Sequence, residues 1–261
     1  MTANEILARF SEQQVAAFFL VLARLSPLFI LAPLFSSKMI PGRVRSVVAV
    51  GLAIGLMPVV KHGPIDLDPL AFAGQMVKEI VVGLAFAYAL AAFFAGLQVA
   101  GSLLDTLIGF SFGSLVDPVT GNQSTVISQL YSLFGVAILI AIGGDAWIIK
   151  GLARTYDKVP MLDAPAIGSL VEGAQVAFSG IFVAAFMIGA PVIIALIITD
   201  AAFGVVSRVV PQMNVFAVGF PAKLIIGLIL LGASLPFVAN NFFNGALQDA
   251  ISQVLHSLKV A

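Results

Sequence analysis

The sequence has no cysteine and few charged side chains. Its 261 residues include thirteen basic and thirteen acidic side chains, 10% of the chain, whereas a soluble domain carries about a quarter. The absence of cysteine excludes disulfides, thiolate metal sites and cysteine nucleophiles. A formal net charge of zero provides no extended basic surface, so we do not expect binding to nucleic acid.

Catalytic motifs in the sequence are incomplete. Residues 109–113 spell the G-x-S-x-G pattern of hydrolases, which needs a strand before the serine, a histidine and an acid. The chain has two histidines, His62 and His256, and an apolar helix is expected before Ser111. No nucleotide-binding, zinc or calcium pattern is present either. We therefore expect neither enzyme activity nor a cofactor.

A second near-match to a catalytic pattern fails at one residue. Gly143, Gly144 and Asp145 approach the G-x-G-D pattern of intramembrane aspartyl proteases, but Ile142 occupies the position of the required first glycine. A membrane enzyme remains an alternative that labelling of Ser111 by an activity-based probe would revive.

Hydrophobic residues dominate the chain, at 60% of the total. About 20 apolar residues are needed for a helix to cross a bilayer. Apolar blocks near this length or longer occupy 13–35, 44–60, 70–108, 126–149, 165–206 and 215–240. Short linkers leave no room for a soluble domain, and the N-terminus lacks the features of a cleaved signal peptide. The sequence predicts an all-α membrane protein.

Several features argue against a simple series of straight spans. The blocks 70–108 and 165–206 are too long for one span, so each is expected to be a bent helix or a hairpin. Lysine and arginine are distributed too evenly over the loops to orient six spans by the positive-inside rule. Prolines also interrupt apolar blocks, where each removes a backbone donor; they are Pro27, Pro33, Pro58, Pro191, Pro221 and Pro236.

Charged side chains lie inside the apolar blocks, where an unpaired charge costs several kcal/mol. They should face protein or water, either as a proton relay or polar pathway or as contacts between helices or subunits. Lys78 and Glu79 are neighbours, so their side chains diverge by about 100° on a helix and each needs its own partner. The residues concerned are Arg24, Lys78, Glu79, Asp105, Asp145, Asp200 and Lys223.

Small residues recur at four-residue spacing, which permits close contact between helices. The pairs are Gly51 with Gly55, Ala92 with Gly96, and Gly180 with Ala184. With 24 glycines in the chain, chance explains many such pairs.

A series of short motifs runs in order along the chain. It begins with Arg24-x-x-Pro27, Ala32-Pro33 and Ile40-Pro41 with Arg43. It continues through Glu79 with Gly83, Ala100-Gly101, Asp105, Gly109-Phe110, Asp117-Pro118, Gly143-Gly144 and Asp200-x-x-Phe203-Gly204. The most specific block is 208–216, in which Arg208, Pro211, Gln212 and Asn214 lie, followed by Gly219-Phe220-Pro221-x-Lys223. In content and order the motifs resemble the FliR family of flagellar export-gate subunits, and the resemblance covers nearly the whole chain.

The resemblance implies one membrane domain over 1–261, with a FliP-like part over about 1–180 and a FliQ-like hairpin over about 181–261. Bent helices and hairpins would pack into a hetero-oligomeric export-gate core in the bacterial inner membrane, at the flagellar basal body. Implied partners are FliP-like, FliQ-like, FlhB-like and FlhA-like proteins, unfolded export substrates and lipid. An injectisome subunit carries a similar C-terminal block and is one alternative. A secondary transporter is another, although no internal inverted symmetry supports it.

Two sets of residues follow as candidate functional positions. The segment 109–123 is rich in glycine and carries an Asp-Pro turn, so we expect a flexible loop. The resemblance implies that this loop is a pore plug, the alternative being an ordinary surface turn; its residues are Gly109, Phe110, Phe112, Gly113, Asp117 and Pro118. Assembly or gate residues are Arg24, Pro27, Lys78, Glu79, Asp105, Asp200, Arg208, Pro211, Gln212, Asn214 and Lys223. The alternative for the group at 208–214 is a polar turn between two helices.

Overall fold

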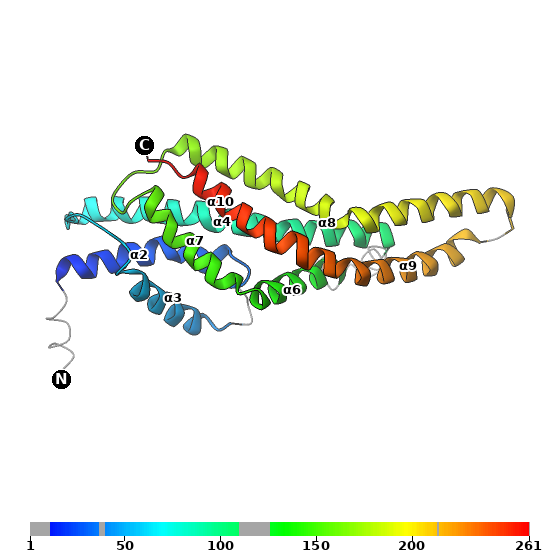
Figure 1. Ribbon diagram of the computed structural model, residues 1–261, viewed down its shortest axis with the longest axis horizontal. Coiled ribbons are helices and arrows are strands. Elements are labelled where there is room, and N and C mark those ends of the chain that lie inside the picture. The colour runs from blue at the N-terminus through cyan, green and yellow to red at the C-terminus, as the bar shows by residue number, and fades with distance from the viewer. Residues whose placement is uncertain (1–10, 37–39, 110–125, 213, 261) are drawn as a thin grey trace. The chain divides into compact units, whose positions relative to one another are not determined.

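A computed structural model describes residues 11–36, 40–109, 126–212 and 214–260, and helices account for most of them (Figure 1). In chain order the helices are α2 (Glu12–Leu31), α3 (Gly42–Leu56), α4 (Pro69–Ile108), α6 (Val126–Ala141), α7 (Gly144–Lys158), α8 (Ile167–Val209), α9 (Val215–Phe237), the π-helix η1 (Val238–Ala246) and α10 (Leu247–Ser257). Extended pairing within these described ranges is limited to a bridge between Pro165 and Val260. The all-α prediction is confirmed.

Four helices are long and apolar enough to cross a membrane: Glu12–Leu31, Pro69–Ile108, Ile167–Val209 and Ala217–Asn240. Helices α6 and α7 meet the same test only when taken together, as one broken span, which would make five. The 15-residue helix α3 is shorter than the roughly 20 residues that a span needs. The described residues therefore provide fewer spans than the six apolar blocks suggest.

The two overlong apolar blocks are continuous helices. Helix α4 has 40 residues and α8 has 43, with Pro191 inside α8. The hairpin alternative for 70–108 and 165–206 is therefore wrong. The hairpin in this region is instead formed by the end of α8 and by α9, which run side by side and are joined through residues 210–214 (Figure 1).

The chain divides into two compact units. Unit 1 consists of Met1–Ala91, Gly143–Phe178 and Gln248–Ala261, and unit 2 consists of Ala92–Ile142 and Ser179–Leu247. Each unit is discontinuous in sequence, so residues far apart along the chain meet within it. The division into a FliP-like part and a FliQ-like hairpin stays a prediction.

Unit 1 is built around α2 and the first half of α4. Helix α2 begins at a capping box, in which Ser11 and Gln14 satisfy each other's backbone donors, an arrangement that fixes a helix start. Its buried residues include Leu20 and Leu28, and α4 contributes the buried Phe86. Gly151 of α7 packs against Phe86, where an added Cβ would lie 3.0 Å from the ring. Helices α4 and α7 therefore meet in the core of unit 1.

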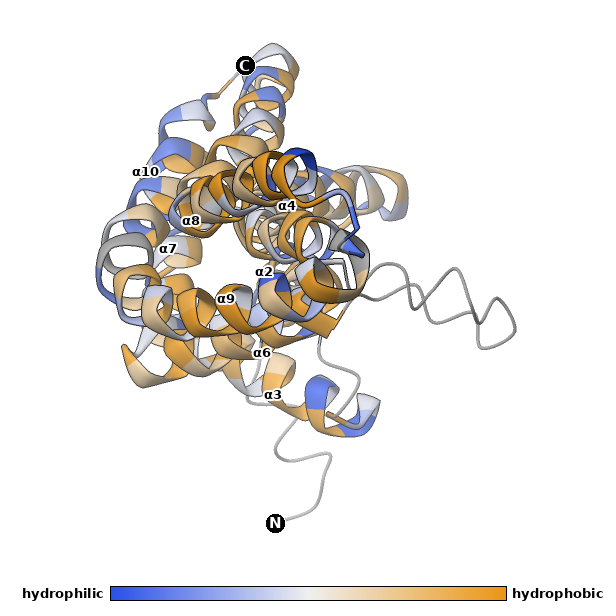
Figure 2. Ribbon diagram, turned by 90° about the vertical axis from the view of Figure 1, so that its right-hand side faces the viewer, coloured by the Kyte–Doolittle hydropathy of each residue, from blue (hydrophilic) through white to orange (hydrophobic). Residues whose placement is uncertain are grey.

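Unit 2 contains the second half of α4, α6, the second half of α8, α9 and η1. A Cβ added at Gly96 of α4 would lie 2.8 Å from the Cβ of Ala184 on α8, so these two small residues mark a close helix contact. A Cβ added at Gly51, Gly55 or Gly180 would instead meet nothing within 4 Å. Figure 2 shows that hydrophobic residues dominate α8 and α9. The contact of Gly96 with Ala184 thus joins one member from each of two expected small-residue pairs, Ala92 with Gly96 and Gly180 with Ala184.

Candidate functional site

Arg24 of α2 and Glu79 of α4 form a buried ion pair in unit 1. Arg24 Nε lies 2.5 Å from Glu79 Oε2, and Nη2 lies 3.1 Å from Oε1. Arg24 is 0% exposed and Glu79 1% exposed. The two parallel hydrogen bonds form the bidentate geometry that is strongest for a guanidinium and a carboxylate.

Helix α7 and Val159, the residue that follows it, supply the remaining partners of Arg24. Nη1 donates to Thr155 Oγ1 at 3.2 Å and to the carbonyl oxygen of Val159 at 2.9 Å. The Tyr156 ring lies 3.9 Å from the guanidinium carbon, which is within range of a cation–π interaction. Gly83, one turn beyond Glu79, allows α4 to approach the Arg24 backbone, because an added Cβ would collide with the Arg24 carbonyl oxygen. One arginine thus connects three helices.

Asp105, near the end of α4, caps the start of α6 within unit 2. Its carboxylate accepts hydrogen bonds from the backbone N–H of Ile127 at 3.0 Å and of Ser128 at 3.1 Å. The Ser128 hydroxyl donates to the Gln98 carbonyl oxygen at 3.0 Å. A negative charge at a helix N-terminus satisfies orphan donors and complements the helix dipole. The contact holds the end of α4 beside the start of α6.

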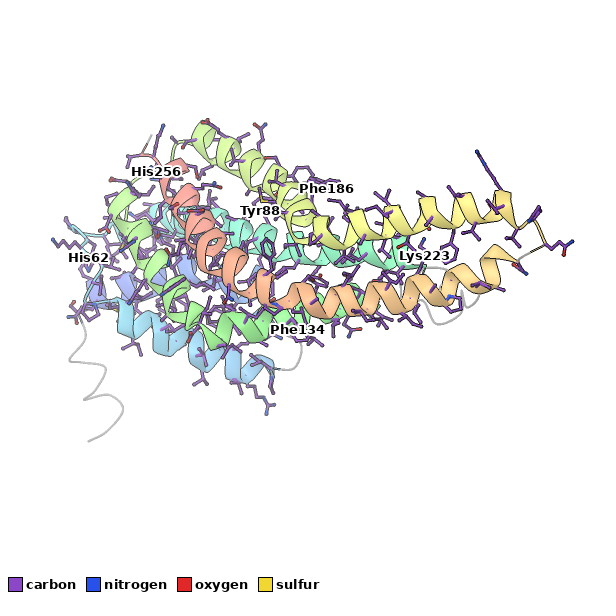
Figure 3. All side chains as sticks on the ribbon, turned by 45° about the vertical axis from the view of Figure 1, so that its right-hand side comes forward. His62, Tyr88, Phe134, Phe186, Lys223 and His256 are labelled. Atoms are coloured by element: carbon purple, nitrogen blue, oxygen red, sulfur yellow. The ribbon has the colours of Figure 1, made fainter. Side chains whose placement is uncertain are left out.

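Asp200 of α8 and Lys223 of α9 form a second ion pair in unit 2. Lys223 Nζ lies 2.7 Å from Asp200 Oδ1 and 2.9 Å from Oδ2. The lysine side chain is 19% exposed and the aspartate side chain 49% exposed. Lys223 lies on the side of α9 that faces α8 (Figure 3). This pair aligns the two arms of the hairpin.

The other expected gate residues lie apart from these pairs. Lys78 is half-buried and contacts no acidic partner among the residues that the structure describes. Pro27 is buried inside α2. Arg208, Pro211 and Gln212 are exposed around the end of α8. Asn214 caps α9, since its side chain accepts a hydrogen bond from the backbone N–H of Ala217 at 3.1 Å. The polar-turn interpretation of 208–214 is therefore supported at Asn214.

The predicted plug lies mostly outside the described residues. Of its residues, Gly109 is described: it follows α4 with φ 101°, a left-handed conformation that glycine adopts without strain. The plug itself stays a prediction, because Phe110, Phe112, Gly113, Asp117 and Pro118 fall in the undescribed segment.

Sequence reasoning missed the contribution of α7 to the Arg24 cluster. Thr155 lies between the apolar blocks 126–149 and 165–206 in sequence, where no buried residue was expected, but it is in the last turn of α7 and is 0% exposed. The sequence pattern that could have revealed this contribution is the recurrence of Ile148, Leu152 and Thr155 at helical spacing, which places them on one face of α7. Within the described ranges, no group of acidic or histidine side chains could hold a metal ion.

The fold and the paired charges define an integral membrane protein of several α-helices, in which charged side chains of one helix bond to another helix of the same chain. Residues 15–249 match the family described as bacterial export proteins, family 1. The chain belongs to this family.

Proteins named for flagellar biosynthesis and for surface presentation of antigens align over most of the chain. The flagellar biosynthetic protein FliR of Bacillus subtilis (strain 168) is 32% identical over 82% of this chain and 84% of its own length. FliR of Escherichia coli (strain K12) is 26% identical, over 91% of this chain and 93% of its own. The surface presentation of antigens protein SpaR of Shigella flexneri is 27% identical, over 86% and 88%. The resemblance to FliR is thereby confirmed.

Proposed function

We propose that this chain is a core subunit of a flagellar type III protein export gate. In this proposal it forms, with FliP-like and FliQ-like subunits, the entrance pore through which unfolded flagellar proteins leave the cytoplasm. The observation that carries the proposal is the family match over 15–249, together with FliR relatives that align along most of their own length. The proposed location is the inner membrane at the flagellar basal body.

The arrangement of charges supports a scaffolding and gating role without bond chemistry. Arg24, Glu79 and Asp105 are buried and bonded to neighbouring helices. A group held in this way is poorly placed to bind a substrate, because each hydrogen bond would have to break first. The proposed work of the subunit is to hold helices around a path for export substrates.

Exposed apolar surface in the second unit supports a role in a larger assembly. Only 28% of the most apolar stretch of Ile167–Val209 and 22% of that of Ala217–Asn240 is buried inside the chain. Asp200 lies half-exposed on this surface, and a carboxylate facing lipid costs several kcal/mol. We therefore propose that other export proteins cover this hairpin, with FliP-like, FliQ-like, FlhB-like and FlhA-like subunits as the candidates.

An injectisome subunit is the second candidate function, supported by the alignment with SpaR of Shigella flexneri. Deletion of the gene from the source bacterium separates the two. The flagellar proposal predicts loss of motility and of secreted flagellar proteins, restored by a plasmid copy. Normal flagellar secretion combined with loss of effector secretion would establish the injectisome function. Unchanged secretion of both kinds would contradict an export role.

The plug belongs to the proposal as its gating element. Phe110 and Phe112 would seal the pore against ions until a substrate enters. Deletion of 111–120 should then raise ion leakage through the assembled complex, measured as depolarisation of the membrane. A fully assembled deletion variant without increased leakage would contradict the plug.

A further inference from the structure

We propose that the outward side of α7 binds the phosphate headgroups of anionic lipids. The residues concerned are Trp147, Lys150, Arg154 and Lys158, called here the α7 basic face. The proposal rests on the surface of unit 1 and holds whether or not the chain works in protein export.

Helical spacing places these four side chains on one side of α7. Lys150, Arg154 and Lys158 follow one another at intervals of four residues, and Trp147 precedes Arg154 by seven. At 3.6 residues per turn all four fall within a sector of about 80°. The three cations are exposed and Trp147 is half-exposed.

The opposite side of α7 is packed inside unit 1. Ile148, Gly151, Leu152, Thr155 and Tyr156 are buried, and Thr155 and Tyr156 contact Arg24. Helix α7 therefore has one orientation in unit 1, with its buried face packed against the other helices and its basic face outward. The basic face cannot turn inward to find partners.

The cations of this face are unpaired within the described parts of the chain. Both ion pairs described above use other residues, and neither hydrogen bonds nor ion pairs join Lys150, Arg154 or Lys158 to a described residue. Asp157 is exposed beside them and leaves the face with a net positive charge. An anionic partner would complete it.

The position of α7 in unit 1 favours a lipid surface. The helix ends at Lys158, and the residues that follow join the C-terminal tail, since the Ala166 N–H donates to the Lys259 carbonyl oxygen at 2.8 Å. The start of α4 lies at this same end of unit 1 (Figure 1), and the linker before it carries the exposed Lys61 and His62. The Lys158 end of the α7 basic face therefore lies at an end of unit 1 that also carries exposed polar residues.

Tryptophan distinguishes this surface from a plain solvated helix face. Trp147 is the one tryptophan in the sequence. Tryptophan is enriched at the boundary between water and hydrocarbon. Lysine and arginine beside it can lay their apolar stems along the hydrocarbon and place their charges among headgroups. The three cations form a row about 12 Å long. Such a row suits a helix that lies in the plane of the boundary between water and hydrocarbon, where anionic headgroups supply the complementary charge.

Fluorescence of Trp147 tests the proposal directly. The full chain, purified in detergent micelles, is titrated with brominated phosphatidylglycerol or brominated phosphatidylcholine, which quench tryptophan on contact. We expect the anionic lipid to bind about tenfold or more tightly, because each cation near an anionic surface contributes about a fivefold preference. The preference should fall at high salt, since screening weakens attraction between exposed charges.

Matched variants distinguish lipid binding by the α7 basic face from attraction of the lipid to exposed cations elsewhere on the chain. The K150Q/R154Q/K158Q variant should quench equally with the two lipids, whereas R43Q/K61Q/K259Q removes as many exposed cations elsewhere and should keep the preference. Trp147→Phe should abolish the signal, and unchanged helical circular dichroism shows that each variant is folded. Equal quenching of the unmodified chain by both lipids, or a preference that survives in K150Q/R154Q/K158Q, overturns the proposal. Equal quenching would leave water or an acidic protein surface as the cover of this face.

Discussion

The guanidinium of Arg24 and the carboxylate of Glu79 are separated by 55 residues in sequence and meet at 2.5 Å inside unit 1. Neither helix could bury its charge alone, because an isolated ion in an apolar environment costs several kcal/mol. Each charge makes the burial of the other possible. The pair therefore specifies which faces of α2 and α4 meet.

Removal of one member of this pair should destabilise the chain strongly. Arg24→Met or Glu79→Leu should each cost about 3–5 kcal/mol in unfolding free energy, since each leaves an unpaired buried charge. The double variant R24M/E79L should recover most of the loss, because an apolar pair of similar volume replaces the ions. Denaturant unfolding in detergent measures this, with the exposed Arg43→Met as the control. A double variant as unstable as the single ones would contradict this account of the pair.

Gly83 should resist enlargement by a single methyl group. A Cβ at Gly83 would collide with the Arg24 carbonyl oxygen, while one at Gly74, in the same helix, would meet nothing within 4 Å. Gly83→Ala should therefore cost about 1–3 kcal/mol through overpacking. Gly74→Ala should be neutral or stabilising, because alanine is the better helix former. Equal unfolding midpoints for these two variants would show that α4 can move away from α2.

Loss of the Asp105 carboxylate should loosen the start of α6. Asp105→Ala removes the acceptor for Ile127 and Ser128 and should cost about 0.5–2 kcal/mol, the usual range for a lost N-cap. Hydrogen exchange at these two amides should accelerate, whereas the exposed Asp157→Ala should leave it unchanged. Unaltered protection at both amides in Asp105→Ala would rule out the cap.

The pair between Asp200 and Lys223 should tolerate reversal of its two members. Because Asp200 is half-exposed, Asp200→Asn or Lys223→Gln should lower stability by no more than about 1 kcal/mol in detergent. The swapped variant D200K/K223D should restore it, since the same two charges face each other across the hairpin. If the swapped variant unfolds earlier than either single variant, groups outside the pair determine these positions.

Sequence patterns predicted the helical class, the apolar blocks and the need for Arg24, Glu79 and Asp105 to face protein or water. They could not identify the partners, because Arg24 also bonds Thr155, which lies 131 residues away. A contact between two segments far apart in sequence produces no repeating pattern of residue types in either segment, so it cannot be predicted from such a pattern. The glycines inside the block 70–108 do not break α4: Gly83 and Gly96 instead allow other helices to approach it, and the sequence pattern predicted such a contact for Gly96. The interruption before α7 lies at Gly143, whose φ of 68° places it in the left-handed region.

The central claim is that the buried charges hold the helices of an export-gate subunit together and take no part in transport. Secretion by a strain whose own copy is replaced by R24M/E79L tests this claim most directly. At equal amounts of assembled complex in the membrane, we expect flagellar protein secretion close to that of the unmodified chain. An assembled complex that no longer secretes would contradict the account and assign Arg24 and Glu79 to the transport step itself.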